Sequence, residues 1–213
     1  MSRPQQLRPE QLRREYEDST RAAHYRDDRW TRSPRARRTN AKELAIVESF
    51  VQQCSGVEAL LDVPCGTGRF RSMLQQHCSS LLSIDASFEM LAAAPSSPQL
   101  QASAHQLPLV DGAVDFILCS RLLHHFETGA ERAIVLAELA RVSKRWIVLS
   151  YFDDANFQAW RNKLRGKFRG RFPISREQFS SEINAAGLAE RGRHYIQRGW
   201  SEQVWVLLEA SNS

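Results

Sequence analysis

Between residues 59 and 208 the chain alternates short apolar runs with amphipathic stretches, and this alternation restricts the fold more than any other feature. Apolar runs of about four to eight residues separated by helical patterns are typical of β-α-β units, which form a mostly parallel sheet. We therefore predict a single doubly wound α/β domain. The predicted strands are 59–63, 81–84, 100–103, 114–119, 146–151, 189–196 and 204–208, and the predicted helices lie near 69–78, 87–93, 129–142 and 175–186.

Capping residues indicate where the domain and its last helix begin. Asn40 precedes apolar residues at helical spacing, which predicts that the folded domain covers residues 41–213. Ser175, with Gln178 three positions later, is expected to open the last helix, and Gly187 is expected to close it.

The formal net charge of the 213 residues is +5, and the positive charge is concentrated in two segments. Residues 1–40 contain eleven Arg against six Asp and Glu, whereas residues 154–172 contain six Lys and Arg against one Asp. The first segment is predicted to be an N-terminal extension with one irregular helix over residues 10–30. The second is predicted to be a basic flap inserted after the fifth strand. Two basic segments attached to an acidic remainder indicate an anionic partner.

The sequence also restricts location and metal content. It has no apolar run of the roughly 18 residues that a membrane span needs and no apolar leader, so we expect a cytoplasmic protein without a transmembrane segment. The spacing of the cysteines fits neither a metal site nor a secreted disulfide scaffold, and we expect reduced thiols and no bound metal. These cysteines are Cys54, Cys65, Cys78 and Cys119.

A glycine loop follows the first predicted strand in the segment LDVPCGTGRF, residues 61–70. Gly66 and Gly68 allow a ligand to approach the backbone, and the start of the next helix presents free N–H groups. Dinucleotide-binding enzymes and plain turns use similar loops. A third glycine is missing, because Arg71 stands at its position, which argues against a dinucleotide enzyme.

Asp85 ends the second predicted strand, 19 positions after Gly66. A carboxylate at this position can accept hydrogen bonds from both hydroxyls of a ribose and disfavours a 2′-phosphate. It can also cap the helix that follows. The glycine loop and Asp85 together predict a site for a ribose-containing ligand.

Over about residues 58–152 the chain resembles the small-molecule class I methyltransferases of the ubiquinone and menaquinone biosynthesis type. The matching segments are LDVPCGTGR, LLSIDASFEML, QASAHQLPLVDGAVDFILCSRLLHHF, ERAIVLAELARV and RWIVLSYF. The resemblance implies a Rossmann-like seven-stranded fold and S-adenosylmethionine as cofactor. It assigns the methionine and ribose parts of that cofactor to Asp62, Pro64, Gly66 and Gly68, the ribose to Asp85 and Ala86, and the adenine to Ser103 and Ala104.

Two residues depart from the pattern of that family. Pro64 stands where the family usually has its first glycine, which removes a backbone N–H and stiffens the entry to the loop. Ser103 stands where the family usually has Asp, and a hydroxyl is a weaker acceptor for the adenine amino group. Binding of the cofactor is expected to survive both changes.

The candidate catalytic residues follow the fourth predicted strand in the segment CSRLLHHF. Methyl transfer needs alignment and removal of a proton from the nucleophile, and His125 or His124 could act as the base. Alternatively, these histidines only pack against the following helix and bond the loop. Arg121 is expected to contact the cofactor region through its backbone, and His105 to line the adenine pocket.

In the family that the chain resembles, the N-terminal extension and the insertion after the fifth strand cover the cofactor and select the substrate. Here these are the two basic segments, so we predict an anionic acceptor: a phosphorylated glycan or lipid, or a small molecule, favoured over RNA. An anionic membrane surface is a further partner that fits, and a solvated loop without a ligand is the alternative. The predicted function is methyl transfer to oxygen of such an acceptor. The alternatives are an RNA methyltransferase and a non-catalytic protein that binds the cofactor.

Overall fold

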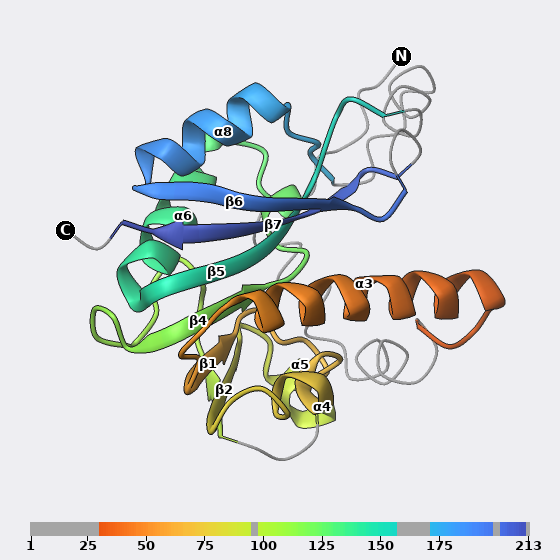
Figure 1. Cartoon of the computed structure of the whole chain (residues 1–213), viewed down its shortest axis with the longest axis vertical. Coiled ribbons are helices and arrows are strands. Elements are labelled where there is room, and N and C mark those ends of the chain that lie inside the picture. Colours follow the sequence, from red (N-terminus) through yellow and green to blue (C-terminus); the bar gives the residue numbers. More distant parts are fainter. Residues whose placement is uncertain (1–29, 95–97, 157–170, 198–200, 212–213) are drawn as a thin grey trace.

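A single seven-stranded sheet forms the centre of the computed structural model, which describes residues 30–94, 98–156, 171–197 and 201–211 (Figure 1). The strand order is β3-β2-β1-β4-β5-β7-β6, and only β7 runs against the others. The predicted α/β class and mostly parallel sheet are confirmed. The strands are β1 (Ala59–Asp62), β2 (Ser80–Asp85), β3 (Gln99–Gln101), β4 (Val114–Cys119), β5 (Ser143–Phe152), β6 (Leu188–Tyr195) and β7 (Gln203–Ala210).

Helices cover both faces of the sheet (Figure 1). On one face α6 and α8 pack on the strands through buried apolar side chains, and on the other face α3 and α4 do the same. β4, β5 and β7 each contain a buried apolar run, residues 116–119, 147–149 and 204–208, as expected for strands that are covered on both faces. The helices are α3 (Pro34–Gln53), α4 (Arg71–Leu74), α5 (Phe88–Ala93), α6 (Gly129–Val142) and α8 (Arg176–Ala185), with a 3₁₀ turn η1 (Leu123–His125).

The first described helix, α3, begins earlier than the sequence predicts. Its N-cap is Ser33, whose hydroxyl accepts a hydrogen bond from the N–H of Ala36 at 3.1 Å, and Pro34 occupies the first helical position. The predicted cap Asn40 lies inside the helix, so this prediction was wrong. Proline needs no hydrogen-bonded N–H at the first position, and the arginines that follow are good helix formers although they carry no apolar periodicity. The helix therefore crosses the predicted boundary between residues 40 and 41.

The other helices differ from prediction mainly at α4. The N–H groups of Ser79 and Ser80 both donate to the carbonyl of Glu58 at 2.9 Å, so the chain turns back into β2 soon after a single helical turn. The expected cap of α8 is confirmed, because the N–H of Gln178 donates to the hydroxyl of Ser175 at 3.1 Å. Gly187 ends this helix with a φ of 71°.

Some predictions concern residues that the structure does not describe. The irregular helix expected over residues 10–30 lies outside the described residues except for Trp30. Residues 157–170 of the basic flap also lie outside them. Among the helices in the described ranges, none has the length and apolar character needed to cross a membrane.

Candidate active site

A cavity of about 780 Å³ opens at the carboxyl ends of the central parallel strands. The loops that follow β1, β2 and β4 form most of its wall. β1 lies between β2 and β4, so the connections leave β1 and β4 in opposite directions and a crevice forms between them. The cavity is thus where a doubly wound sheet binds its ligand.

The glycine loop forms one side of this cavity. The N–H of Cys65 donates to the carbonyl of Ile84 at 2.9 Å, which fastens the loop to the end of β2. Gly66 and Gly68 have φ values of 54° and 75°, a region that favours glycine. Gly66 lines the cavity together with Pro64, whereas the wall formed by the described residues does not include Gly68.

Asp85 connects the glycine loop to the next element of the site. Its side chain is only 7% exposed and lines the cavity. One carboxylate oxygen accepts from the N–H of Gly66 at 2.8 Å and the other from the N–H of Ser87 at 2.9 Å. Burial raises the pKa of Asp85, although these backbone donors act against that effect. Ser87, and not Asp85, caps α5, which corrects the capping role considered for Asp85.

Asp62 lies at the end of β1 beneath the loop and is absent from the cavity wall that the described residues form. It is 1% exposed, and its Oδ1 atom has no hydrogen-bond partner in the described part of the chain. Burial and the neighbouring Asp85 raise the pKa of Asp62 to about 8. Burial therefore favours the protonated form of the Asp62 carboxyl.

The opposite side of the cavity contains the residues assigned to adenine. Ala86, Ser103 and Ala104 all line it. The hydroxyl of Ser103 lies 3.1 Å from Nδ1 of His105, whose ring packs edge-on against Phe126 with a centroid distance of 5.0 Å. Both His105 and Phe126 belong to the wall. The sequence predicted His105 there but gave no reason to select Phe126.

The two candidate catalytic histidines lie on η1 and both line the cavity. His124 is 3% exposed, and its ring stacks on Phe152 with a centroid distance of 3.9 Å. Its carbonyl accepts from the N–H of Phe172 at 2.8 Å, which ties η1 to the end of the basic flap. His125 is only half-buried. His124 therefore packs on β5 and not on the helix that the sequence suggested, and His125 is the histidine left as the candidate for contact with a ligand.

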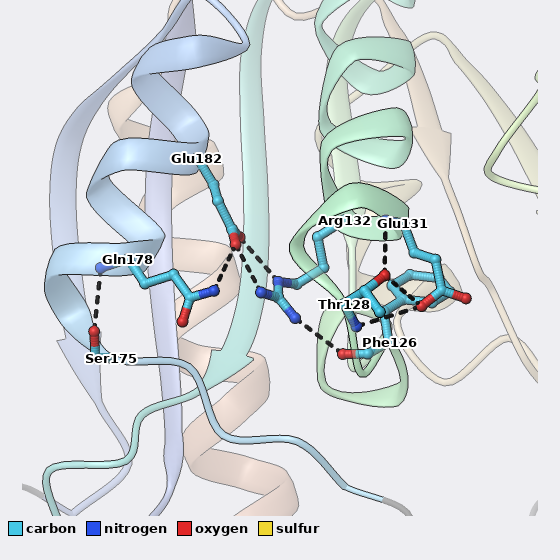
Figure 2. A network of polar contacts seen from close by, with 7 residues as sticks. All are labelled: Phe126, Thr128, Glu131, Arg132, Ser175, Gln178 and Glu182. Carbon is cyan, nitrogen blue, oxygen red and sulfur yellow. Dashed lines mark hydrogen bonds and ion pairs between the residues drawn. The ribbon is translucent and has the colours of Figure 1, made fainter.

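A buried arginine holds the loop that carries these histidines (Figure 2). Arg132 of α6 donates from Nε and Nη2 to the two carboxylate oxygens of Glu182 on α8, at 2.9 and 2.7 Å. Its Nη1 donates to the carbonyl of Phe126 at 3.0 Å. The capping box of Thr128 and Glu131 fixes the start of α6 next to this network. The wall of the cavity is therefore anchored to both helices of this face.

A second charged group lies at the other end of the cavity. Arg121, in the left-handed region with a φ of 60°, donates its N–H to the hydroxyl of Ser150 at 2.8 Å. Its side chain and that of Arg69 both pair with the carboxylate of Glu43 on α3. Arg69, Arg121 and Trp30 all line the cavity. The sequence identified only Arg121, because nothing local connects Glu43 or Trp30 with residues so distant along the chain.

The comparisons with known proteins agree with this site. A family model described as "Methyltransferase domain" matches residues 61–146, from the end of β1 to the start of β5. The malonyl-[acyl-carrier protein] O-methyltransferase of Hamiltonella defensa subsp. Acyrthosiphon pisum (strain 5AT) is 33% identical over 89 residues, which are 40% of this chain and 33% of that protein. The match thus spans about a third of the length of this curated relative.

Solved structures extend the likeness to nearly the whole chain. Magnesium protoporphyrin IX methyltransferase from Synechocystis PCC 6803 with bound SAH aligns with a TM-score of 0.73 at 15% identity, over 94% of this chain and 98% of that one. The N-methyltransferase NodS from Bradyrhizobium japonicum WM9 aligns with a TM-score of 0.65 at 14% identity, over 82% of this chain and 97% of that one. The sequence match around the cavity and the fold agree: residues 61–146 match the methyltransferase domain model, and the chain has the Rossmann-like fold of the solved S-adenosylmethionine-dependent methyltransferases.

Proposed function

We propose that this chain binds S-adenosylmethionine in the cavity and transfers its methyl group to an oxygen atom of an anionic acceptor. The observation that carries the proposal is Asp85, held at the cavity wall by the N–H of Gly66 at 2.8 Å. Backbone N–H groups, among them those of Gly66 and Ser87, hold both of its oxygens at the wall, where the carboxylate could accept hydrogen bonds from the hydroxyls of a ribose.

The remaining cofactor residues are assigned by their place around Asp85. Ala86 adjoins the ribose, Ser103 and Ala104 adjoin the adenine, and Pro64 and Gly66 adjoin the methionine part. Asp62 at the end of β1, Gly68 within the glycine loop and Arg121 after β4 are assigned supporting roles. This arrangement leaves the side of the cavity next to His125 for the acceptor.

The charge around that side supports an anionic acceptor. Arg171, at the end of the basic flap, lines the cavity and lies over the ring of Phe152 at 5.6 Å. Six Lys and Arg between residues 154 and 172 repel one another, and a bound anion would offset this repulsion. The name of the curated relative, an O-methyltransferase acting on a malonyl group, supports oxygen as the methylated atom and an acidic acceptor.

The proposed role of the histidine depends on the nature of the acceptor oxygen. A hydroxyl acceptor must lose a proton during transfer, and His125 would remove it. A carboxylate acceptor is already ionised at neutral pH, so His125 would then orient the acceptor by a hydrogen bond.

Calorimetric titration with S-adenosylhomocysteine tests the cofactor site. Asp85→Asn should weaken binding by about tenfold to a hundredfold, because it loses charge-assisted hydrogen bonds. Asp111→Asn is the control, since Asp111 is exposed and lies outside the cavity wall of the described residues. Equal affinities of Asp85→Asn and wild type would contradict the assignment.

A second measurement tests the acceptor side. Turnover is measured against a panel of acidic acceptors that includes malonyl-acyl-carrier protein. For an acceptor that is methylated, replacing Arg165, Lys167 and Arg169 by Ser should raise KM and reduce its dependence on ionic strength, because salt screens exposed charges. Equal KM and equal salt dependence would show that the charges do not bind the acceptor. Tight S-adenosylhomocysteine binding without turnover of any acceptor, RNA included, would favour the non-catalytic alternative, which the two departures Pro64 and Ser103 support.

A further inference from the structure

We propose that the first turns of α3 form a docking site for an anionic lipid surface. The docking site, called the basic arm, comprises residues 31–42. It contains five cations and no Asp or Glu: Arg32, Arg35, Arg37, Arg38 and Lys42. The cavity wall formed by the described residues includes none of these cations, so the proposal is independent of methyl transfer.

The basic arm projects from the body of the fold. Within the described residues, the buried side chains of α3 begin at Glu43 and end at Val51, so residues 34–42 add nothing to the core. α3 has 20 residues and is about 30 Å long, whereas β1 has 4 residues and spans about 13 Å. Because α3 ends shortly before β1 begins and runs alongside the sheet, its first turns extend past the carboxyl end of β1 (Figure 1).

The cations of the basic arm have no carboxylate partner in the described part of the chain. The ion pairs between residues of the ranges 30–94, 98–156, 171–197 and 201–211 include none of the five, although all five are exposed. Exposed cations elsewhere are paired; Arg145 and Arg191, for example, both contact Glu209. The positive charge of the arm is therefore not neutralised within the described fold.

The cations of the arm also repel one another along one side of the helix. Arg35, Arg38 and Lys42 are spaced three and four residues apart, so they lie on one face. Arg37 lies off this face and donates to the carbonyl of Thr31 at 2.8 Å. The first turn of α3 has no acidic residue, and the helix dipole adds partial positive charge at this end. A bound anionic surface would offset this repulsion.

The basic arm offers charge without apolar anchors. The large apolar side chains that are exposed among the described residues all lie elsewhere: Phe88, Leu100, Val110 and Ile134. A stable protein partner needs apolar or aromatic anchors at the centre of the interface, and a single-stranded nucleic acid needs aromatic rings on which its bases stack. An anionic lipid surface needs neither, because each Lys or Arg close to it strengthens binding. The lipid surface is therefore the partner that the arm fits.

The basic arm is fixed to the rim of the cavity at both of its ends. Trp30 precedes the arm, and its ring centre lies 3.8 Å from the guanidinium of Arg69. Glu43 follows the arm and pairs with the same guanidinium. Trp30 and Arg69 both line the cavity. A chain that docks through the arm thus holds this end of the cavity near the lipid headgroups.

Co-sedimentation of the full chain with vesicles tests the proposal. Wild type should bind vesicles that contain phosphatidylglycerol, should not bind vesicles of phosphatidylcholine alone, and should lose binding as salt is added. Arg35→Gln, Arg38→Gln and Lys42→Gln should each weaken binding about fivefold, and the triple variant about a hundredfold. Because Gln has nearly the helix propensity of Arg and Lys, the triple variant should keep the wild-type melting temperature. The single variants provide the same test if the triple variant does not fold.

The matched control removes three cations elsewhere. The side chains of Lys144, Arg145 and Arg191 are 54%, 55% and 55% exposed, and they lie on β5 and β6. Their replacement by Gln changes the net charge by the same amount but should weaken vesicle binding less than about fivefold.

Three results would overturn the proposal. Equal losses in the two triple variants would show that the vesicles respond only to net charge. Wild type that binds both kinds of vesicle equally would show that anionic lipid is not recognised. A duplex RNA that binds through the three residues of the arm more tightly than the vesicles, at the same salt concentration, would assign the arm to nucleic acid. Vesicle binding by a chain that does not bind S-adenosylhomocysteine would refute the proposed function and leave this proposal intact.

Discussion

The ion pair between Arg132 and Glu182 joins α6 to α8, and its side chains are only 3% and 12% exposed (Figure 2). Glu182→Leu removes the anion and leaves the buried guanidinium of Arg132 bonded to the Phe126 carbonyl alone. Removing one partner of a buried pair costs about 3–5 kcal/mol of the free energy of unfolding. The double variant Arg132→Met with Glu182→Leu leaves no charge at this buried pair. Its loss in the free energy of unfolding should be at least about 3 kcal/mol smaller than the sum of the losses in the two single variants.

Urea unfolding followed by tryptophan fluorescence measures these free energies, provided that the m-values of the variants agree. Asp111→Asn is a control that breaks an exposed pair with Arg141, in which Asp111 is 82% exposed, and it should cost less than about 1 kcal/mol. A coupling below about 1 kcal/mol between Arg132 and Glu182 would refute the reasoning. Arg132→Met should also lower turnover, because the Phe126 carbonyl loses the donor that fixes the cavity wall.

Three further predictions concern single residues of the site. Gly66 lines the cavity, and a Cβ there would meet no atom within 4 Å, so the side chain of Gly66→Val should extend into the cavity and abolish S-adenosylhomocysteine binding in calorimetry. Gly56→Val is the control, because Gly56 also has a positive φ and open space around it. This control should strain the backbone by a similar roughly 1–2 kcal/mol and keep binding. Normal binding by Gly66→Val would contradict this. His125→Ala should lower turnover and remove one limb of the pH profile if the acceptor is a hydroxyl, while His124→Ala should mainly lower the melting temperature. Two unchanged profiles would assign both rings to packing. Burial raises the pKa of Asp62 from 3.8 to about 8 in the folded state. Between these two pH values the folded state binds more protons than the unfolded state, so the free energy of unfolding should fall as the pH rises from about 4 to about 8. Asp62→Asn should flatten this slope and raise stability at pH 7 in urea unfolding, and an unchanged slope would show that Asp62 does not titrate there.

Local sequence patterns predicted those elements in which local preference and burial agree. The strand Val114–Cys119 and the helix Gly129–Val142 were predicted with the bounds that the structure has. The start of α3 was missed because its first turns are stabilised by a cap and by helix propensity, without an apolar stripe. The antiparallel direction of β7 was not predicted, since a strand buried on both faces has the same apolar pattern in either direction.

The sequence by itself determined the parts of the site that lie close together along the chain. The glycine loop and Asp85 belong to one β-α-β unit, so their spacing was enough to place both at one predicted ligand site, and the hydrogen bond from Gly66 to Asp85 shows that they are adjacent. Only the tertiary structure decided the charged end of the cavity. Glu43 lies 26 positions from Arg69 and 78 from Arg121, and the three meet because β1 and β4 are neighbours in the sheet and α3 packs across their face. The effect of these charges on one another depends on burial and mutual distance, and neither can be read from the local sequence.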